Sequence, residues 1–137
     1  MMRHKRILIL IWLLLIAFWA GAQDRNYSGC LTKKNSSWGQ PCANCEAYTA
    51  DLKRDHSGTY QVDLQNTCGD VIEVKVALEE KGGIWRTFPV KALAPGEQMN
   101  AYACLGTGKY MYWVRRANDS EIVLPTDSQI LTEYRSR

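Results

Sequence analysis

Residues 71–79 read Val-Ile-Glu-Val-Lys-Val-Ala-Leu-Glu, and this stretch decides the fold. Its even-numbered side chains are all apolar: Ile72, Val74, Val76 and Leu78. The charged residues Glu73 and Lys75 stand between them. Apolar residues that recur with a period of two, several of them β-branched, are typical of a β-strand with one buried face. The sequence therefore predicts its strongest strand here.

The same alternation extends to both sides of this strand. Residues 59–65 alternate around Val62, and turn-forming residues separate them from the strand at 71–79. Further strands are predicted at 47–53, 84–93, 98–105, 110–115 and 121–124, with a last one near 130–134. Pro89 reduces part of 84–93 to an edge or a bulge, because proline cannot donate a ladder hydrogen bond. Roughly six to eight short strands with turns between them predict an all-β fold, a small antiparallel sandwich.

The first 22 residues predict a cleavable signal peptide. Arg3, Lys5 and Arg6 precede an uncharged apolar run at 7–20, and Ala20-Gly21-Ala22 follows it as a small-x-small cleavage site. The run is shorter than the roughly 20 apolar residues that a membrane-spanning helix needs. We expect cleavage after Ala22, secreted or periplasmic localisation, and no stable membrane insertion after cleavage. An uncleaved signal anchor is the alternative.

The charge balance argues against a nucleic-acid partner. The chain has 17 Lys and Arg residues against 14 Asp and Glu. Three of the basic residues lie in the predicted leader, so the rest of the chain is balanced. Basic patches are the usual electrostatic footprint of nucleic-acid binding. The net positive charge of the chain therefore comes from the predicted signal peptide and does not indicate a nucleic-acid partner.

The remainder of the chain divides in two by pattern. Residues 23–46 are rich in Asn, Ser, Gly and Lys and show no sustained period, which predicts an irregular segment that contains cysteines. Residues 47–137 form the predicted sandwich domain. A long segment without secondary structure is uncommon in a compact domain unless something pins it. We expect disulfide bonds to hold this N-terminal loop in place.

Five cysteines are available for such bonds: Cys30, Cys42, Cys45, Cys68 and Cys104. In an oxidising compartment they are most simply interpreted as two disulfides and one leftover thiol. Spacing alone leaves the connectivity open. We predict a Cys68–Cys104 bridge, because both residues lie in the β region. Cys30 would then pair with Cys42 or Cys45, and one of these three would stay free.

The Cys42-Ala43-Asn44-Cys45 motif invites comparison with thioredoxin-type redox sites. Such sites work because a helix N-terminus activates the first thiol. Here no apolar strand precedes the motif and no βαβ pattern follows it, so a structural disulfide is favoured. Glu46 stands where haem attachment would need histidine. A zinc site drawn from Cys30, Cys42, Cys45 and Cys68 is disfavoured because only one CxxC pair exists.

The sequence offers no catalytic constellation. His56 is the single histidine after the leader, and it falls in a turn. Nucleophilic catalysis by serine or cysteine usually needs a positioned base. We therefore expect a non-enzymatic protein without a cofactor. A small secreted hydrolase is the least favoured hypothesis.

An aromatic stretch is the candidate binding site. Along residues 110–115, Tyr110 and Tyr112 share one face of the predicted strand, while Trp113 and Arg115 share the other. One face must belong to the core. The other suits contact with a sugar or a protein, because aromatic rings beside Arg are enriched at protein hot spots. The alternative is that Trp113 itself packs in the core.

Residues 60–116 resemble the immunoglobulin-like domains of bacterial exported proteins, in particular the cell-adhesion-related sandwich family. The resemblance rests on the strand at 74–78, the turn Leu93-Ala94-Pro95-Gly96-Glu97 and the hairpin at 108–112. The chain departs from that pattern at Cys68 and Cys104. The resemblance implies an immunoglobulin-like sandwich, an exported protein, and a role in binding or scaffolding.

These observations predict an exported, non-enzymatic binding module or structural accessory. Its partner would be a protein or a carbohydrate. The alternative is a thiol–disulfide accessory protein that uses Cys42 and Cys45.

Overall fold

The computed structural model describes residues 26–45 and 54–134. The predicted cleavage site after Ala22 and the predicted strand at 47–53 lie outside these residues. The described elements are the 3-10 helix η1 (Tyr27–Cys30), the strands β1 (Leu31–Trp38), β2 (Tyr60–Asn66), β3 (Ile72–Glu80), β4 (Ile84–Thr87), β5 (Lys91–Leu93), β6 (Gln98–Ala103) and β7 (Gly106–Arg116), and the helix α2 (Asp127–Glu133). Neither helix of this described part has the length and apolar character needed to cross a membrane.

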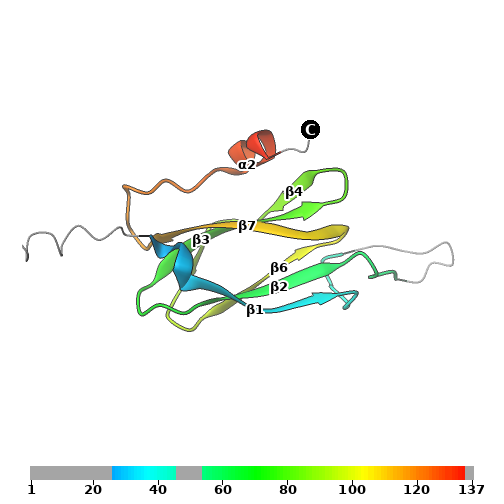
Figure 1. Cartoon of the computed structure of the whole chain (residues 1–137), viewed down its shortest axis with the longest axis horizontal. Coiled ribbons are helices and arrows are strands. Elements are labelled where there is room, and N and C mark those ends of the chain that lie inside the picture. Colours follow the sequence, from blue (N-terminus) through cyan, green and yellow to red (C-terminus); the bar gives the residue numbers. More distant parts are fainter. Residues whose placement is uncertain (1–25, 46–53, 135–137) are drawn as a thin grey trace, which may run out of the picture.

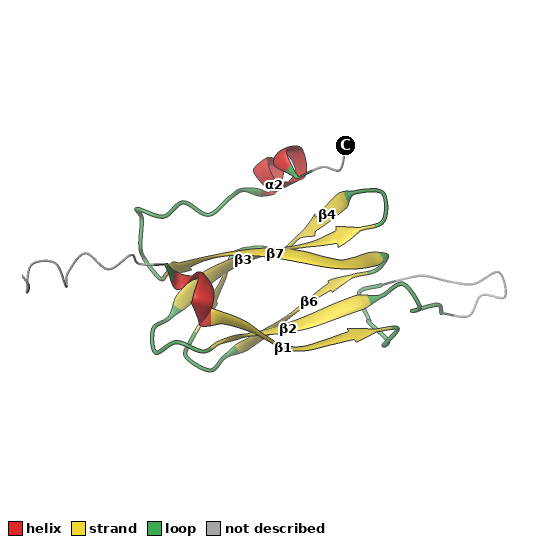
Figure 2. Ribbon diagram, in the orientation of Figure 1, coloured by secondary structure: helices red, strands yellow, loops and turns green. Residues whose placement is uncertain are grey.

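The strands form two sheets that face each other (Figures 1 and 2). One sheet has the order β1-β2-β6. In the other, β3 is central, with β4 and β5 along one edge and β7 along the other. Every pairing is antiparallel. The predicted antiparallel, all-β architecture is thus confirmed.

The core lies between the two sheets, where the alternating strands meet. β2 and β3 supply most of its fully buried members: Val62, Leu64, Ile72, Val74, Val76 and Leu78. In β2 the intervening residues stay partly exposed, as expected for a strand with one buried face. β6 completes the layer by placing Ala101 and Ala103 opposite β2. The apolar residues that recur with a period of two in the sequence are therefore the residues of this core.

β3 is buried on both of its faces. Lys75 and Ala77 point away from the inter-sheet core, yet only 4% and 0% of their surfaces are exposed. Ala77 belongs to a second small core with Trp85 and Ile130, against which Met111 and Trp113 pack. The C-terminal segment therefore covers the outer face of the β3 sheet, with α2 lying over it in Figure 1.

The C-terminal segment corrects two predictions. Residues 130–134 were expected to form a strand, but 127–133 form α2. A capping box starts this helix: Gln129 N donates to Thr126 Oγ1 at 3.2 Å, and Thr126 N donates to Gln129 Oε1 at 2.9 Å. Such reciprocal caps satisfy two unpaired backbone donors. The predicted strand at 121–124 is also absent, since this segment pairs with no other strand.

The prediction that 23–46 is irregular is wrong for β1. Residues 31–38 pair with β2 along its whole length, with an irregular register between Lys33 and Asn35. β1 is an edge strand of its sheet, and only Leu31 is buried in it. A strand that buries almost nothing needs no apolar period, so its sequence carries none. Its β conformation comes from pairing with β2.

The predicted strand at 84–93 is divided in two. β4 pairs with the C-terminal half of β3, and β5 pairs with the N-terminal half. Residues 88–90, which include Pro89, separate them. Proline disrupts a ladder because it has no N–H to donate. The single strand expected over 84–93 is therefore wrong: an edge or a bulge was expected at Pro89, whereas β4 ends before it and β5 begins after it.

Candidate functional site

One end of the sandwich, which we call the loop end, gathers segments that are far apart in the chain. It is made by residues 38–45, 56–60, 80–84 and 104–108. Backbone hydrogen bonds tie these segments together: Gly39 N to Thr59 O (2.9 Å), Lys81 N to Leu105 O (2.8 Å) and Gly106 N to Gly58 O (2.8 Å). In Figure 1 the loop end lies on the right, where β1 ends and β7 begins.

The two disulfides join Cys30 to Cys68 and Cys45 to Cys104. Cys42 is the free cysteine, and it is buried. The predicted Cys68–Cys104 bridge is therefore wrong, and so is the predicted pairing of Cys30 with Cys42 or Cys45.

The length of β2 explains this connectivity. Cys104 follows Ala103, which pairs with Tyr60 at the start of β2, whereas Cys68 follows the end of β2 at Asn66. A strand rises about 3.3 Å per residue, so the two cysteines stand near opposite ends of the sandwich. Each disulfide instead pins the N-terminal segment to the sandwich, one at either end.

Polar side chains surround Cys104 at the loop end. Arg86 Nη2 lies 3.8 Å from Cys104 Sγ, and Cys104 N donates to Glu80 Oε1 at 2.9 Å. Arg86 Nε also donates to Glu80 Oε1 at 3.1 Å, and its guanidinium lies 5.2 Å from the ring centroid of Tyr102. Only the β3–β4 hairpin brings Glu80 and Arg86 to Cys104, so no local sequence pattern indicates this group.

The predicted binding residues divide between the two faces of β7, as their alternation requires. Tyr110 and Tyr112 pack against the inter-sheet core. Trp113 packs on the opposite face, against the small core beneath α2. Arg115 lies on this second face as well. The four residues therefore do not make one patch, and each face needs its own assessment.

On the outer face, Trp113 and Arg115 are engaged by the chain itself. The rings of Trp113 and Tyr134 lie 5.8 Å apart, centroid to centroid. Arg115 Nη1 donates to Ile122 O at 2.9 Å, and Arg115 Nε forms an ion pair with Glu73. The C-terminal segment thus occupies the surface that these two residues would offer to a partner.

On the inner face, Tyr110 and Tyr112 belong to a larger aromatic group. Trp38 pairs directly with Tyr60 in the β1–β2 ladder, and their rings lie 4.9 Å apart. The rings of Tyr110 and Tyr112 stack with centroids 6.3 Å apart. Burial raises the pKa of the Tyr110 hydroxyl, and neighbouring Tyr60 and Tyr112 add to this increase.

Trp38 also approaches β7, the strand that carries Tyr110 and Tyr112. A Cβ atom built on Gly108 of β7 would lie 3.2 Å from Cζ2 of Trp38, so the indole of β1 reaches across to the facing sheet. Half of the Trp38 surface, 50%, is nevertheless exposed. We call Trp38, Tyr60, Tyr110 and Tyr112 the aromatic row. It lies on the side of the sandwich between the edge strands β1 and β7.

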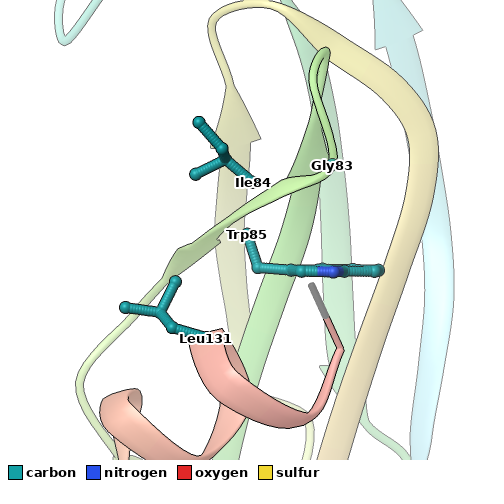
Figure 3. Close-up of a pocket in the computed structure, with 4 residues that line it drawn as sticks. All are labelled: Gly83, Ile84, Trp85 and Leu131. Carbon is teal, nitrogen blue, oxygen red and sulfur yellow. The ribbon is translucent and has the colours of Figure 1, made fainter. Parts of the chain in front are cut away.

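A shallow apolar groove of about 270 Å³ lies between β4 and α2 (Figure 3). Gly83, Ile84, Trp85 and Leu131 line it. Trp85 Nε1 donates to Tyr134 O at 2.7 Å, which fixes the indole beneath the end of α2. None of the described residues that line the groove has a charged side chain.

His56 and the cysteines are the residues that the sequence offered for catalysis or metal binding. Within 26–45 and 54–134, no group of three or more His, Cys, Asp or Glu side chains could hold a metal ion. Nδ1 of His56 is buried without a hydrogen-bond partner. The Ser57 N–H donates to Asp55 at 2.9 Å and lowers the pKa of that carboxyl. Three of the four cysteines of the zinc alternative, Cys30, Cys45 and Cys68, are in disulfides.

Comparison of the chain with protein-family models, with curated proteins and with solved structures finds no match in any of the three.

Proposed function

We propose that this protein is an exported, non-enzymatic binding module whose contact surface is centred on Trp38, the most exposed member of the aromatic row. The observation that carries the proposal is the state of Trp38. Its indole is held between Tyr60 and Gly108, yet half of its surface is exposed. A side chain that is already ordered loses little conformational entropy when a partner covers it.

A protein partner fits the aromatic row better than a carbohydrate. Tryptophan and tyrosine are enriched at the hot spots of protein interfaces. The row lies between two edge strands, and an edge strand can hydrogen-bond an extended peptide along its backbone. Exposed lysines on the flanking strands, Lys33, Lys34 and Lys109, favour a peptide that carries acidic residues.

Export is part of the same proposal. Two disulfides fit a protein that matures in an oxidising compartment, either secreted or periplasmic. The predicted leader and the resemblance to immunoglobulin-like domains of cell-adhesion type support the same placement. The immunoglobulin-like assignment is likewise proposed, on the basis of two facing antiparallel sheets that share one core.

The binding proposal is tested with the purified exported protein on two arrays, one of extended peptides of varied charge and one of glycans. We expect peptides to bind, acidic ones most tightly. Trp38→Ala should weaken their binding by about 30-fold, which corresponds to the roughly 2 kcal/mol of a hot-spot residue.

The matched control is Val123→Ala, which truncates a side chain that is 82% exposed on the C-terminal segment, away from the row. Its peptide binding should equal that of the unmodified protein. Binding of glycans alone, or peptide binding that survives Trp38→Ala, would refute the proposal.

A further inference from the structure

We propose that Cys42 and the Cys45–Cys104 disulfide form an internal thiol–disulfide exchange site, in which Cys42 attacks Cys45 and releases Cys104 as the free thiol. This inference does not depend on the aromatic row or on any partner. It rests on three cysteines that meet at the loop end, and on a cation beside the sulfur that would leave.

The first observation concerns the attacking thiol. Cys42 is the free cysteine, and it stands three residues before Cys45. Cys45 N donates to Cys42 O at 3.0 Å, which closes a turn over these four residues. A turn of this kind holds its end Cα atoms within about 7 Å, while disulfides span roughly 4.4–6.8 Å between Cα atoms. A Cys42–Cys45 bridge therefore needs only a local adjustment.

The second observation concerns the leaving sulfur. Arg86 Nη2 lies 3.8 Å from Cys104 Sγ, so a guanidinium already stands where negative charge would develop. A nearby cation stabilises a thiolate, and a more stable thiolate leaves faster. Arg86 is itself held in place by Glu80 at 3.1 Å and by the ring of Tyr102. The cation is thus positioned before the reaction begins.

The contacts also bring the turn to Cys104. Cys104 Sγ lies 4.0 Å from the carbonyl oxygen of Asn44, the residue before Cys45. Cys104 N donates to Glu80 Oε1 at 2.9 Å, which fixes the backbone on the other side of the sulfur. Before the step, the Cys104 sulfur is therefore held beside both Arg86 and the turn.

The step balances without an oxidant or a reductant. The Cys42 thiol gives its proton to water, and its sulfur forms a bond to Cys45 Sγ. The Cys45–Cys104 bond breaks, and its electron pair leaves on Cys104 as a thiolate that can take a proton from water. One disulfide and one thiol are present before and after the step.

The consequence is a change in which thiol is accessible. Cys42 is only 7% exposed, whereas Cys104 is partly exposed. Exchange would also release residues 42–45 from the β6–β7 turn. The chain could in this way store its reactive thiol in a buried position and present it at the loop end.

Tryptic mapping of the unreduced protein distinguishes the two isomers directly. Cys42 and Cys45 share the peptide 35–53, and Cys104 lies in the peptide 92–109. The protein is incubated at about pH 8, near the ordinary pKa of a thiol. At successive times its free thiol is alkylated with excess N-ethylmaleimide, and the protein is then digested with trypsin. We expect alkylated Cys104 to accumulate, together with a free peptide 35–53 that contains an internal bridge. If alkylation stays on Cys42 and the two peptides remain cross-linked, the proposal is wrong.

Three variants and one internal control sharpen this experiment. Cys42→Ser should leave Cys104 unlabelled, because the attacking thiol is gone. Arg86→Gln should slow the labelling of Cys104 by about tenfold, while Arg86→Lys, which keeps a positive charge, should slow it less. The peptides 26–33 and 55–75, which carry Cys30 and Cys68, should stay cross-linked throughout. Labelling of these two cysteines would show general scrambling and would overturn the proposed specific exchange.

Discussion

The indole of Trp38 lies against the backbone of Gly108, at the distance where a Cβ atom on that glycine would come within 3.2 Å of Cζ2. This contact joins β1 of one sheet to β7 of the other. Gly108 also has a positive φ of 87°, a conformation that residues with a side chain rarely adopt. The glycine therefore serves both the backbone turn and the position of Trp38.

Gly108→Ala should destabilise the protein more than an alanine at a comparable glycine does. Gly82 is the matched control, because its φ is 91° and nothing lies within 4 Å of the Cβ that alanine would add. Both substitutions cost about 1 kcal/mol of backbone strain. Only Gly108→Ala must also displace Trp38, so its free energy of unfolding in urea should fall further. Equal losses for the two variants would contradict the Trp38–Gly108 contact.

Acid should loosen α2 before it unfolds the sandwich. Lys75 is buried on the outer face of β3 and forms an ion pair with Asp127 at the start of α2. The hydrogen bond from Lys75, with a second from Thr87, lowers the pKa of the Asp127 carboxyl from its ordinary value of 3.8. A lowered pKa in the folded state means that this contribution to stability is present above pH 3.8 and is lost as the pH falls below it.

The measurement is tryptophan fluorescence, because Trp85 and Trp113 lie in the small core that α2 covers. Below about pH 4 we expect their emission to shift to the red while the β-sheet signal in circular dichroism persists. Asp127→Asn should show the shifted emission already at neutral pH. Glu133→Gln, on the same helix but without a contact to Lys75, should behave like the unmodified protein. An unchanged acid transition in Asp127→Asn would refute this account.

Each disulfide should contribute several kcal/mol to stability. The Cys30–Cys68 and Cys45–Cys104 bridges link residues 38 and 59 positions apart. On the chain-entropy model, loops of this size contribute about 4 kcal/mol each. Replacing Cys30 and Cys68 together by Ala should lower the free energy of unfolding by about this amount, measured by urea denaturation. A loss below about 1 kcal/mol would mean that the unfolded chain is not constrained by this bridge.

Trp113→Ala separates packing from binding. Trp113 packs against the small core and the ring of Tyr134, so its truncation should cost about 3 kcal/mol of stability and loosen α2. Trp38→Ala should cost only about 1 kcal/mol, the range of one aromatic pair, since half of that side chain is exposed. Thermal unfolding of the two variants, side by side, tests this order. A larger loss for Trp38→Ala would show that the aromatic row is mainly a packing feature.

The sequence predicts the strands that bury one face, because burial imposes a local pattern. Residues 59–65 and 71–79 alternate with a period of two, and the structure places β2 and β3 there. β1 could not be predicted in this way, because a polar edge strand has no apolar period. α2 was not predicted for another reason. The sequence of residues 130–134 is compatible with a strand, but the capping box and the burial of Ile130 favour a helix.

For the candidate sites, too, the sequence predicts one part and the tertiary structure decides the other. Alternation alone separates Tyr110 and Tyr112 from Trp113 and Arg115 on β7, and the structure agrees. Nothing in the local sequence places Trp38 beside β7, because that approach depends on the β1–β2 register and on the distance between the two sheets.

By itself, the sequence determined the antiparallel β architecture, the position of its central strand and the number of cysteines left over once two bridges form. Tertiary structure alone decided which cysteines pair, that Arg86 stands beside Cys104, and that the C-terminal segment covers Trp113. The reason is physical. Alternation is a property of neighbouring residues, whereas a disulfide or a covered face depends on where a strand ends, many residues away along the chain.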